Sequence, residues 1–242
     1  MQPNSKQQTN VLEATLKHLM APGKGILAAD ESTKSAQKRF DALSIPFNEE
    51  ARRQWRQLLI STPNSQDFLS GVIFYDETIR QRDDSGKSFP QLLIEQGVLP
   101  GIKVDAGLVD LNNFPQEQIT EGLDGLDVRL KEYYRMGARF AKWRAAYTIG
   151  SKIPSEAAIH ANGNVFGRYA SLCQSNGIIP IIEPEVLYDG DHSLDECLEA
   201  TSRVLSTSLD IVRAYRVDMR HIVVKTGMVL AGKRYRAQST PE

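Results

Sequence analysis

Six short apolar segments recur along this chain, and a stretch with helical periodicity separates each from the next. The segments are GILAADE at 25–31, GVIFYDE at 71–77, GIKVD at 101–105, RFAKWR at 139–144, IIPIIEPEV at 178–186 and HIVVKTGM at 221–228. Runs of this length and composition are typical of strands. Because no two of them are joined by a turn of hairpin length, the pattern predicts a parallel sheet.

The stretches between the strands predict helices. They are expected over residues 10–20, 33–43, from about 48 onward, 90–96, 123–137, 154–177 and 194–212. In the helix that starts near residue 48, the spacing predicts that Ala51, Trp55, Leu58 and Leu59 share a face. The order of elements is therefore strand, helix, strand, helix.

Two parallel architectures fit this order, an open doubly wound sheet and a closed eight-stranded barrel. An open dinucleotide-binding sheet normally has a glycine-rich turn after its first strand, and AADESTKS at 28–35 has no glycine. Charged residues in several strands also favour the barrel, whose site is assembled around one mouth. The sequence thus predicts a TIM (β/α)8 barrel of the α/β class, limited to about its first six βα units, as a single incomplete domain over residues 1–242.

Composition narrows the possible partners. The chain has 29 basic and 30 acidic residues and a net charge of -1, which gives no support to a nucleic-acid or anionic-membrane surface. The polar N-terminus lacks an apolar segment, and no stretch approaches the roughly 20 apolar residues of a membrane span. The chain has only two cysteines, Cys173 and Cys197, and so low a number fits a reducing compartment better than a disulfide framework. We expect a cytoplasmic protein that acts on a small-molecule substrate.

Five of these segments, at 25–31, 101–105, 139–144, 178–186 and 221–228, carry charged side chains that are candidates for a site. Burying a charge costs several kcal/mol unless it is paired, so such a pattern indicates either a functional site or a network of ion pairs in a barrel interior. Alternation along a strand directs residues two apart to the same side. Together the candidates balance four cations with four anions, namely Lys103, Lys142, Arg144 and Lys225 with Asp30, Asp105, Glu183 and Glu185.

Lys225 is the strongest candidate because apolar residues flank it on both sides. Burial would desolvate its ammonium and lower its pKa, and a second ammonium from Lys142 would lower that pKa further. The alternative is a lysine at a strand end that extends toward solvent. Pro184 has no N–H, so it is either a strand-end kink or a device that fixes Glu183 and Glu185 at the mouth.

Hydroxyl side chains follow the first strand. Ser32 and Ser35 can cap the next helix or receive a phosphate, while capping is the expected role of Thr33. Arg39 and Arg52 follow on helices, where a solvated surface charge is the commoner role than a ligand. The four histidines lie in unrelated segments, and DGDH at 189–192 is interpreted as a polar turn, so we expect no metal and no cofactor.

The chain resembles the class I, Schiff-base family of fructose-bisphosphate aldolases. The resemblance rests on APGKGILAADEST at 21–33, GVIFYDET at 71–78, GIKVD, GLDGL at 122–126, AKWR, residues 168–192 and VVKTGMV at 223–229, and it covers essentially the whole chain. It implies reversible, metal-independent cleavage of fructose 1,6-bisphosphate to dihydroxyacetone phosphate and glyceraldehyde 3-phosphate, in glycolysis and gluconeogenesis. It also implies a homo-oligomer, commonly a tetramer.

The resemblance further implies residue roles. Lys225 would attack the C2 ketone, and Glu183 would be the general acid/base, with Asp30, Lys142 and Glu185 completing the shell; the acceptor of the C4 hydroxyl proton stays open between Glu183 and Asp30. The substrate contacts implied are Ser32, Ser35 and Lys103 at the C6 phosphate, with Arg144, Arg39 and Arg52 as further contacts.

Some positions depart from the family pattern. Gly227 and Ala231 stand where a larger residue and a proline are usual, and the chain ends at residues 239–242, before the family's last βα units, its C1-phosphate loop and its C-terminal tail. Six strands do not close an eight-stranded barrel, so exposed strand edges, low stability and little cleavage activity are expected. The alternative function is a catalytically silent fragment that only binds phosphates or partner subunits.

Overall fold

The computed structural model describes residues 5–238, so the sequence features at residues 1–4 and 239–242 lie outside the described residues. The α-helices are α1 Ser5–Leu19, α2 Thr33–Ala42, α3 Glu49–Ile60, α4 Asp76–Ile79, α5 Phe89–Glu95, α6 Leu126–Arg135, α7 Glu156–Ser175 and α8 Leu194–Ala214. Two short 3-10 helices are η1 Ser65–Asp67 and η2 Met219–His221. The strands are β1 Gly25–Ala29, β2 Leu69–Phe74, β3 Leu99–Lys103, β4 Gly107–Asp110, β5 Gln118–Glu121, β6 Phe140–Tyr147, β7 Ile179–Val186 and β8 Val223–Val224.

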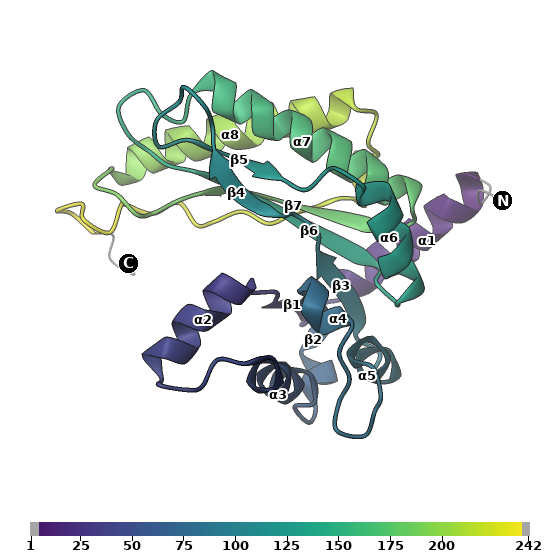
Figure 1. Cartoon of the computed structure of the whole chain (residues 1–242). Coiled ribbons are helices and arrows are strands. Elements are labelled where there is room, and N and C mark those ends of the chain that lie inside the picture. Colours follow the sequence, from purple (N-terminus) through teal and green to yellow (C-terminus); the bar gives the residue numbers. More distant parts are fainter. Residues whose placement is uncertain (1–4, 239–242) are drawn as a thin grey trace. The chain divides into compact units, whose positions relative to one another are not determined.

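Six strands form one sheet in the order β1-β2-β3-β6-β7-β8, of which Figure 1 labels all but β8. The pairs β1/β2, β2/β3, β3/β6 and β7/β8 are parallel, which confirms the predicted parallel sheet. The chain divides into a first unit of residues 1–104, 127–142 and 175–179 and a second unit of residues 105–126, 143–174 and 180–242. The strand β6 contributes to both units.

The first unit is centred on the Phe140 ring, which lies against two glycines of neighbouring strands. A Cβ atom built on Gly101 would stand 2.2 Å from this ring, and one built on Gly71 would stand 2.8 Å from it. Both distances are too short for any side chain, so glycine is required at these positions. Phe74 and Ile102 are fully buried in the same unit.

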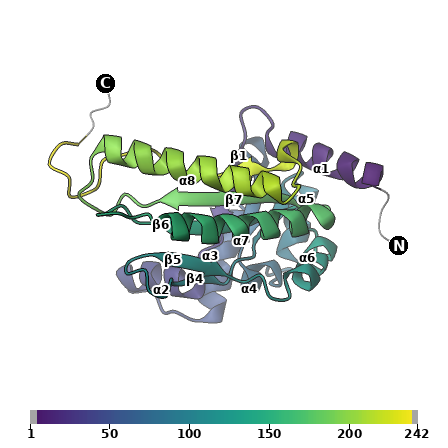
Figure 2. The ribbon, with the colours of Figure 1, turned by 90° about the horizontal axis from the view of Figure 1, so that it is seen from above.

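The second unit places α7 and α8 side by side along one face of β7 (Figures 1 and 2). The two helices approach closely at Gly163. A Cβ atom on this residue would come within 2.6 Å of the Ile211 side chain. Under α7, the ring of Tyr169 lies 5.4 Å from that of Trp143 in β6, and its hydroxyl donates to the carbonyl of Ile181 in β7 at 3.2 Å. The core of this unit is therefore built between α7 and its strands.

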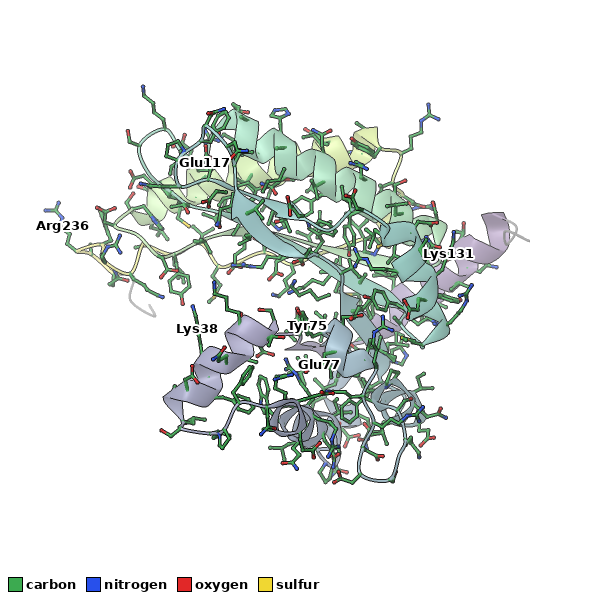
Figure 3. The ribbon with its side chains drawn as sticks, in the orientation of Figure 1. Lys38, Tyr75, Glu77, Glu117, Lys131 and Arg236 are labelled. Carbon is green, nitrogen blue, oxygen red and sulfur yellow. The ribbon has the colours of Figure 1, made fainter. Side chains whose placement is uncertain are left out.

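An antiparallel pair, β4 with β5, interrupts the predicted alternation, and the sequence did not predict it. The two strands are short and half polar, and seven residues, 111–117, connect them. Their conformation depends on a distant side chain: Asn162 of α7 accepts from the Thr120 N–H at 3.2 Å and donates to the Gln118 carbonyl at 2.9 Å. Glu117, labelled in Figure 3, accepts from the Ser155 N–H at 2.7 Å.

Local burial departs from the sequence pattern in two places. On α3, Leu58 of the predicted shared face is 68% exposed, while Arg56 is buried at 3% exposure. A charged side chain can occupy that position because its guanidinium finds a carboxylate and a carbonyl there, as described below. The strand predicted over 221–228 is limited to Val223–Val224, so Lys225 follows the strand instead of lying inside it.

Candidate active site

The charged residues singled out in the sequence lie in strands of the parallel sheet or directly after them. Asp30 follows β1 and Lys225 follows β8, while the remaining members lie in or next to β3, β6 and β7. Parallel α/β sheets form their sites at the carboxyl ends of strands. The structure resolves the set into three ion pairs, one in the first unit and two in the second.

In the first unit, Lys142 and Asp30 form a buried ion pair. The Nζ atom of Lys142 lies 2.6 Å from Oδ2 of Asp30, and the two side chains are 6% and 8% exposed. Lys103 occupies the register position opposite Lys142 on the neighbouring strand β3. Two cations are thus placed on adjacent strands, with a buried carboxylate against one of them.

Ser32 caps α2, so the expectation that Thr33 is the cap was wrong. The Ser32 Oγ accepts from the Ser35 N–H at 3.3 Å, and the two hydroxyls are 3.2 Å apart. Thr33 is the first residue of the helix. Both serines predicted to hold a phosphate therefore lie together at the first turn of α2, where helix N–H groups favour an anion.

The two candidate arginines of the first unit are held by carboxylates. Arg39 lies 3.0 Å from Glu31 and is 64% exposed, whereas Arg52 binds Glu77 in a two-point contact at 2.9 and 2.7 Å. The guanidinium of Arg52 also lies 4.8 Å from the centre of the Phe47 ring. Glu77 stands in the first turn of α4 (Figure 3). Both arginines are therefore paired with carboxylates. Arg39 has the exposure of a solvated surface charge, whereas the Arg52 side chain is only 15% exposed, and their role as substrate contacts stays a prediction.

In the second unit, Lys225 pairs with Glu183. The Lys225 ammonium donates to Oε1 of Glu183, and the Lys225 N–H donates to the Ile182 carbonyl at 2.9 Å. The Glu183 side chain is 6% exposed, but that of Lys225 is 46% exposed. The prediction that apolar neighbours bury this lysine was therefore wrong, since the strand ends before it and Met228 is 77% exposed.

The third pair joins Arg144 of β6 to Glu185 of β7. The Arg144 Nε lies 2.5 Å from Glu185 Oε2, with both side chains about one-third exposed. The Arg144 N–H also donates to Oδ2 of the buried Asp105 at 3.3 Å. Because Lys142 lies in the first unit and Lys225 in the second, the effect of one ammonium on the pKa of the other stays a prediction.

Sequence reasoning missed the carboxylates that organise the first unit. Glu31 and Glu77 each end one of the apolar segments, and Arg56 is one of three arginines on α3. These acidic strand ends and basic helix positions were the available signal that carboxylates and arginines pair here. Arg56 donates to Glu31 twice, to the carboxylate and to the main-chain carbonyl.

The remaining reactive side chains are buried or lie in turns. Cys173 and Cys197 are both buried free thiols, and burial raises the pKa of Cys173. Among residues 5–238, no three His, Cys, Asp or Glu side chains gather in a way that could hold a metal ion. Residues 189–192 lie in the loop before α8, and Ser193 caps this helix through a reciprocal contact with Glu196.

The strand order and the architecture define an α/β protein of the TIM-barrel class, with ion pairs at strand ends in each unit. The family model for glycolytic class-I fructose-bisphosphate aldolase matches residues 11–242. The chain belongs to this family, whose members are carbon–carbon lyases.

Named relatives agree. A probable class 1 fructose-bisphosphate aldolase of Xanthomonas campestris is 46% identical over 231 residues, which cover 96% of this chain and 69% of the relative. Cytosolic fructose-bisphosphate aldolase 4 of Arabidopsis thaliana is 45% identical over 97% of this chain and 60% of its own length. The Plasmodium falciparum aldolase, solved with TRAP and a small-molecule inhibitor, superposes with a TM-score of 0.94 at 41% identity, over 97% of this chain and 68% of that chain.

The chain thus spans between 60% and 69% of the length of these relatives. None of the helices within residues 5–238 has the length and apolar character needed to cross a membrane.

Proposed function

We propose that this chain acts on fructose 1,6-bisphosphate through a Schiff base at Lys225, with Glu183 as the general acid/base. The observation that carries the proposal is the direct ion pair between the two side chains. A lysine that is 46% exposed can reach a substrate carbonyl, and a carboxylate that is 6% exposed beside it can take and return a proton out of bulk water.

The first half of the reaction forms the iminium. The Glu183 carboxylate takes a proton from the Lys225 ammonium, and the free amine attacks the C2 ketone to give a carbinolamine. The protonated Glu183 then gives its proton to the C2 hydroxyl, which leaves as water while the C=N bond forms. The iminium nitrogen is positively charged and stabilises an electron pair at C3.

The second half breaks the C3–C4 bond. The C4 hydroxyl loses its proton to a carboxylate, for which Glu183 and Asp30 are the two candidates, and the bonding electrons move into the enamine. Glyceraldehyde 3-phosphate leaves, C3 is protonated, and water hydrolyses the iminium to release dihydroxyacetone phosphate. Reversal of the same steps joins the two trioses.

Substrate binding is assigned to the remaining charged and hydroxyl groups. Ser32 and Ser35 at the start of α2, together with Lys103, are proposed to bind the C6 phosphate, and Arg144 is a further contact. The pairs Lys142–Asp30 and Arg144–Glu185 are proposed to supply fixed charge near the reacting atoms. Arg39 and Arg52 have the least support as ligands, because Glu31 and Glu77 hold them.

One observation favours the second candidate, a catalytically silent member that only binds phosphates or partner subunits. The Lys225 Nζ atom is bound by the Glu183 carboxylate, so a substrate carbonyl would have to displace this ion pair before the lysine could attack. Cytoplasmic location and a homo-tetramer are part of the proposal by family likeness. The location is supported by relatives that carry the word cytosolic in their names.

Borohydride trapping separates the two candidates. The chain is incubated with dihydroxyacetone phosphate and borohydride, and peptide mass spectrometry locates the adduct. We expect one reduced adduct on Lys225, absent from Lys225→Met and retained in Lys233→Met, which removes an exposed lysine further along the same segment. No adduct on the unaltered chain would favour the silent member.

A further inference from the structure

The turn between β1 and α2 carries three consecutive polar residues with different partners. Asp30 pairs with Lys142 at 2.6 Å, and Ser32 caps α2. Glu31 lies between them in the sequence, and its carboxylate pairs with two arginines, Arg39 and Arg56. The position of Glu31 therefore sets the position of a proposed catalytic carboxylate on one side and a proposed phosphate-binding hydroxyl on the other.

Arg56 of α3 holds Glu31 at two points. Its Nη1 donates to Oε2 of the Glu31 carboxylate at 2.6 Å, and its Nη2 donates to the Glu31 main-chain carbonyl at 3.0 Å. The side chain of Arg56 is 4% exposed, so both hydrogen bonds are shielded from water. A planar guanidinium can make both bonds at once, whereas an ammonium cannot match this fork.

Aromatic packing fixes the guanidinium in turn. It lies 4.1 Å from the centre of the Trp55 ring, and that ring meets Phe40 of α2 edge-on at 5.6 Å between centroids. The helix α2 is thus attached to α3 at two places, at its N-terminal turn through Glu31 and along its length through Phe40. Both attachments pass through neighbouring residues, Trp55 and Arg56.

We propose that Arg56 is a positioning residue. By its hydrogen bonds to Glu31 it fixes the conformation of residues 30–32, and so the position of the hydroxyls proposed to bind the C6 phosphate. This inference rests on the proposed function of Ser32 and Ser35. Arg56 donates to Glu31, and its proposed action on Ser32 and Ser35 passes through that residue. Loss of these hydrogen bonds should therefore weaken the binding of ligands that carry a C6 phosphate and leave the binding of those that lack one unchanged.

The test compares two ketoses in the trapping reaction. Fructose 1,6-bisphosphate carries the C6 phosphate, while dihydroxyacetone phosphate corresponds to carbons 1–3 alone. In Arg56→Gln, we expect the half-saturating concentration of fructose 1,6-bisphosphate to rise about tenfold, the worth of one charge-assisted hydrogen bond, and that of dihydroxyacetone phosphate to change less than about twofold. Arg56→Lys should fall between Arg56→Gln and the unaltered chain.

Arg53→Gln is the matched control, because Arg53 is the neighbouring α3 arginine whose carboxylate partners are Glu50 and Asp84. It should leave both concentrations unchanged. Glu31→Gln combined with Arg56→Gln should cost no more than the larger single change, since the two residues act as one unit. Equal losses for both ketoses in Arg56→Gln, or no loss for either, would overturn the proposal.

Amide hydrogen exchange keeps the inference testable without catalysis. The N–H groups of Ser35 and Ala36 bond to the Ser32 side chain and carbonyl, so their protection reports the order of the turn. We expect faster exchange over residues 31–36 in Arg56→Gln and not in Arg53→Gln. If the unaltered chain forms no adduct with either ketose, the proposed function fails, and unchanged exchange in Arg56→Gln would then refute the positioning role as well.

Discussion

Lys225 donates to Glu183 across the β8/β7 pair, so the proposed nucleophile and the proposed general acid/base are already in contact. Their exposures differ: the lysine is half exposed and the glutamate is almost fully buried. This difference is consistent with the proposed roles, in which the exposed lysine reaches the substrate and the buried glutamate transfers the proton.

Glu183→Gln should slow adduct formation on Lys225 by about 10²- to 10⁴-fold, the usual contribution of a positioned proton donor and acceptor. The amide keeps the size of the carboxylate but cannot cycle a proton. The rate is followed by mass spectrometry at saturating dihydroxyacetone phosphate. Glu199→Gln on the exposed face of α8 is the control, and a Glu183→Gln rate equal to that of this control would contradict the assignment.

Lys142→Met should destabilise the chain by about 3 to 5 kcal/mol, because it leaves the buried Asp30 carboxylate without its ammonium. Asp30→Asn combined with Lys142→Met should cost less than the sum of the two single changes. Urea unfolding measures all three variants. Lys131→Met, which breaks an exposed pair with Asp127 on α6 (Figure 3), should cost no more than about 1 kcal/mol.

Gly101→Ala should destabilise the chain by about 1 to 3 kcal/mol, since the new methyl group would overlap the Phe140 ring. Gly25→Ala on β1 meets no atom within 4 Å and should change stability by less than about 0.5 kcal/mol. Thermal and urea unfolding distinguish the two. Equal stabilities would show that the ring moves aside without cost.

Asp218 should make the free energy of unfolding depend on pH in the acid range. Its hydrogen bonds from Arg220 hold the pKa of the folded carboxyl below that of the unfolded chain. A lowered folded-state pKa gives stability that is present above the unfolded value, about 3.9, and is lost as the pH falls below it.

Asp218→Asn should therefore be less stable than the unaltered chain near about pH 7, with the difference narrowing below about pH 4. Asparagine can still accept from the Arg220 N–H, but its NH2 group cannot accept from the Arg220 Nη2, so the change removes the charge together with one guanidinium hydrogen bond. Urea midpoints over this range give the comparison, with Asp41→Asn on the exposed side of α2 as control. A difference that is constant with pH would contradict the linkage.

Local sequence patterns were sufficient for the six parallel strands and most of the helices between them, because apolar periodicity follows directly from which face is buried. They were also sufficient to place Asp30, Lys142, Glu183 and Lys225 in or beside strands. Local patterns could not predict the β4/β5 hairpin, because its main-chain groups bond to the side chain of Asn162, which is more than forty residues away.

The sequence by itself determined the family, the parallel sheet and the identity of the charged candidates, because each depends on residue type and spacing along the chain. Only the tertiary structure decided which charges pair: Lys142 with Asp30, Lys225 with Glu183, and Arg56 with Glu31. Pairing depends on which side chains face each other across strands and helices. For the same reason the apolar neighbours of Lys225 do not bury it, since burial is set by the end of β8 and by what packs around it.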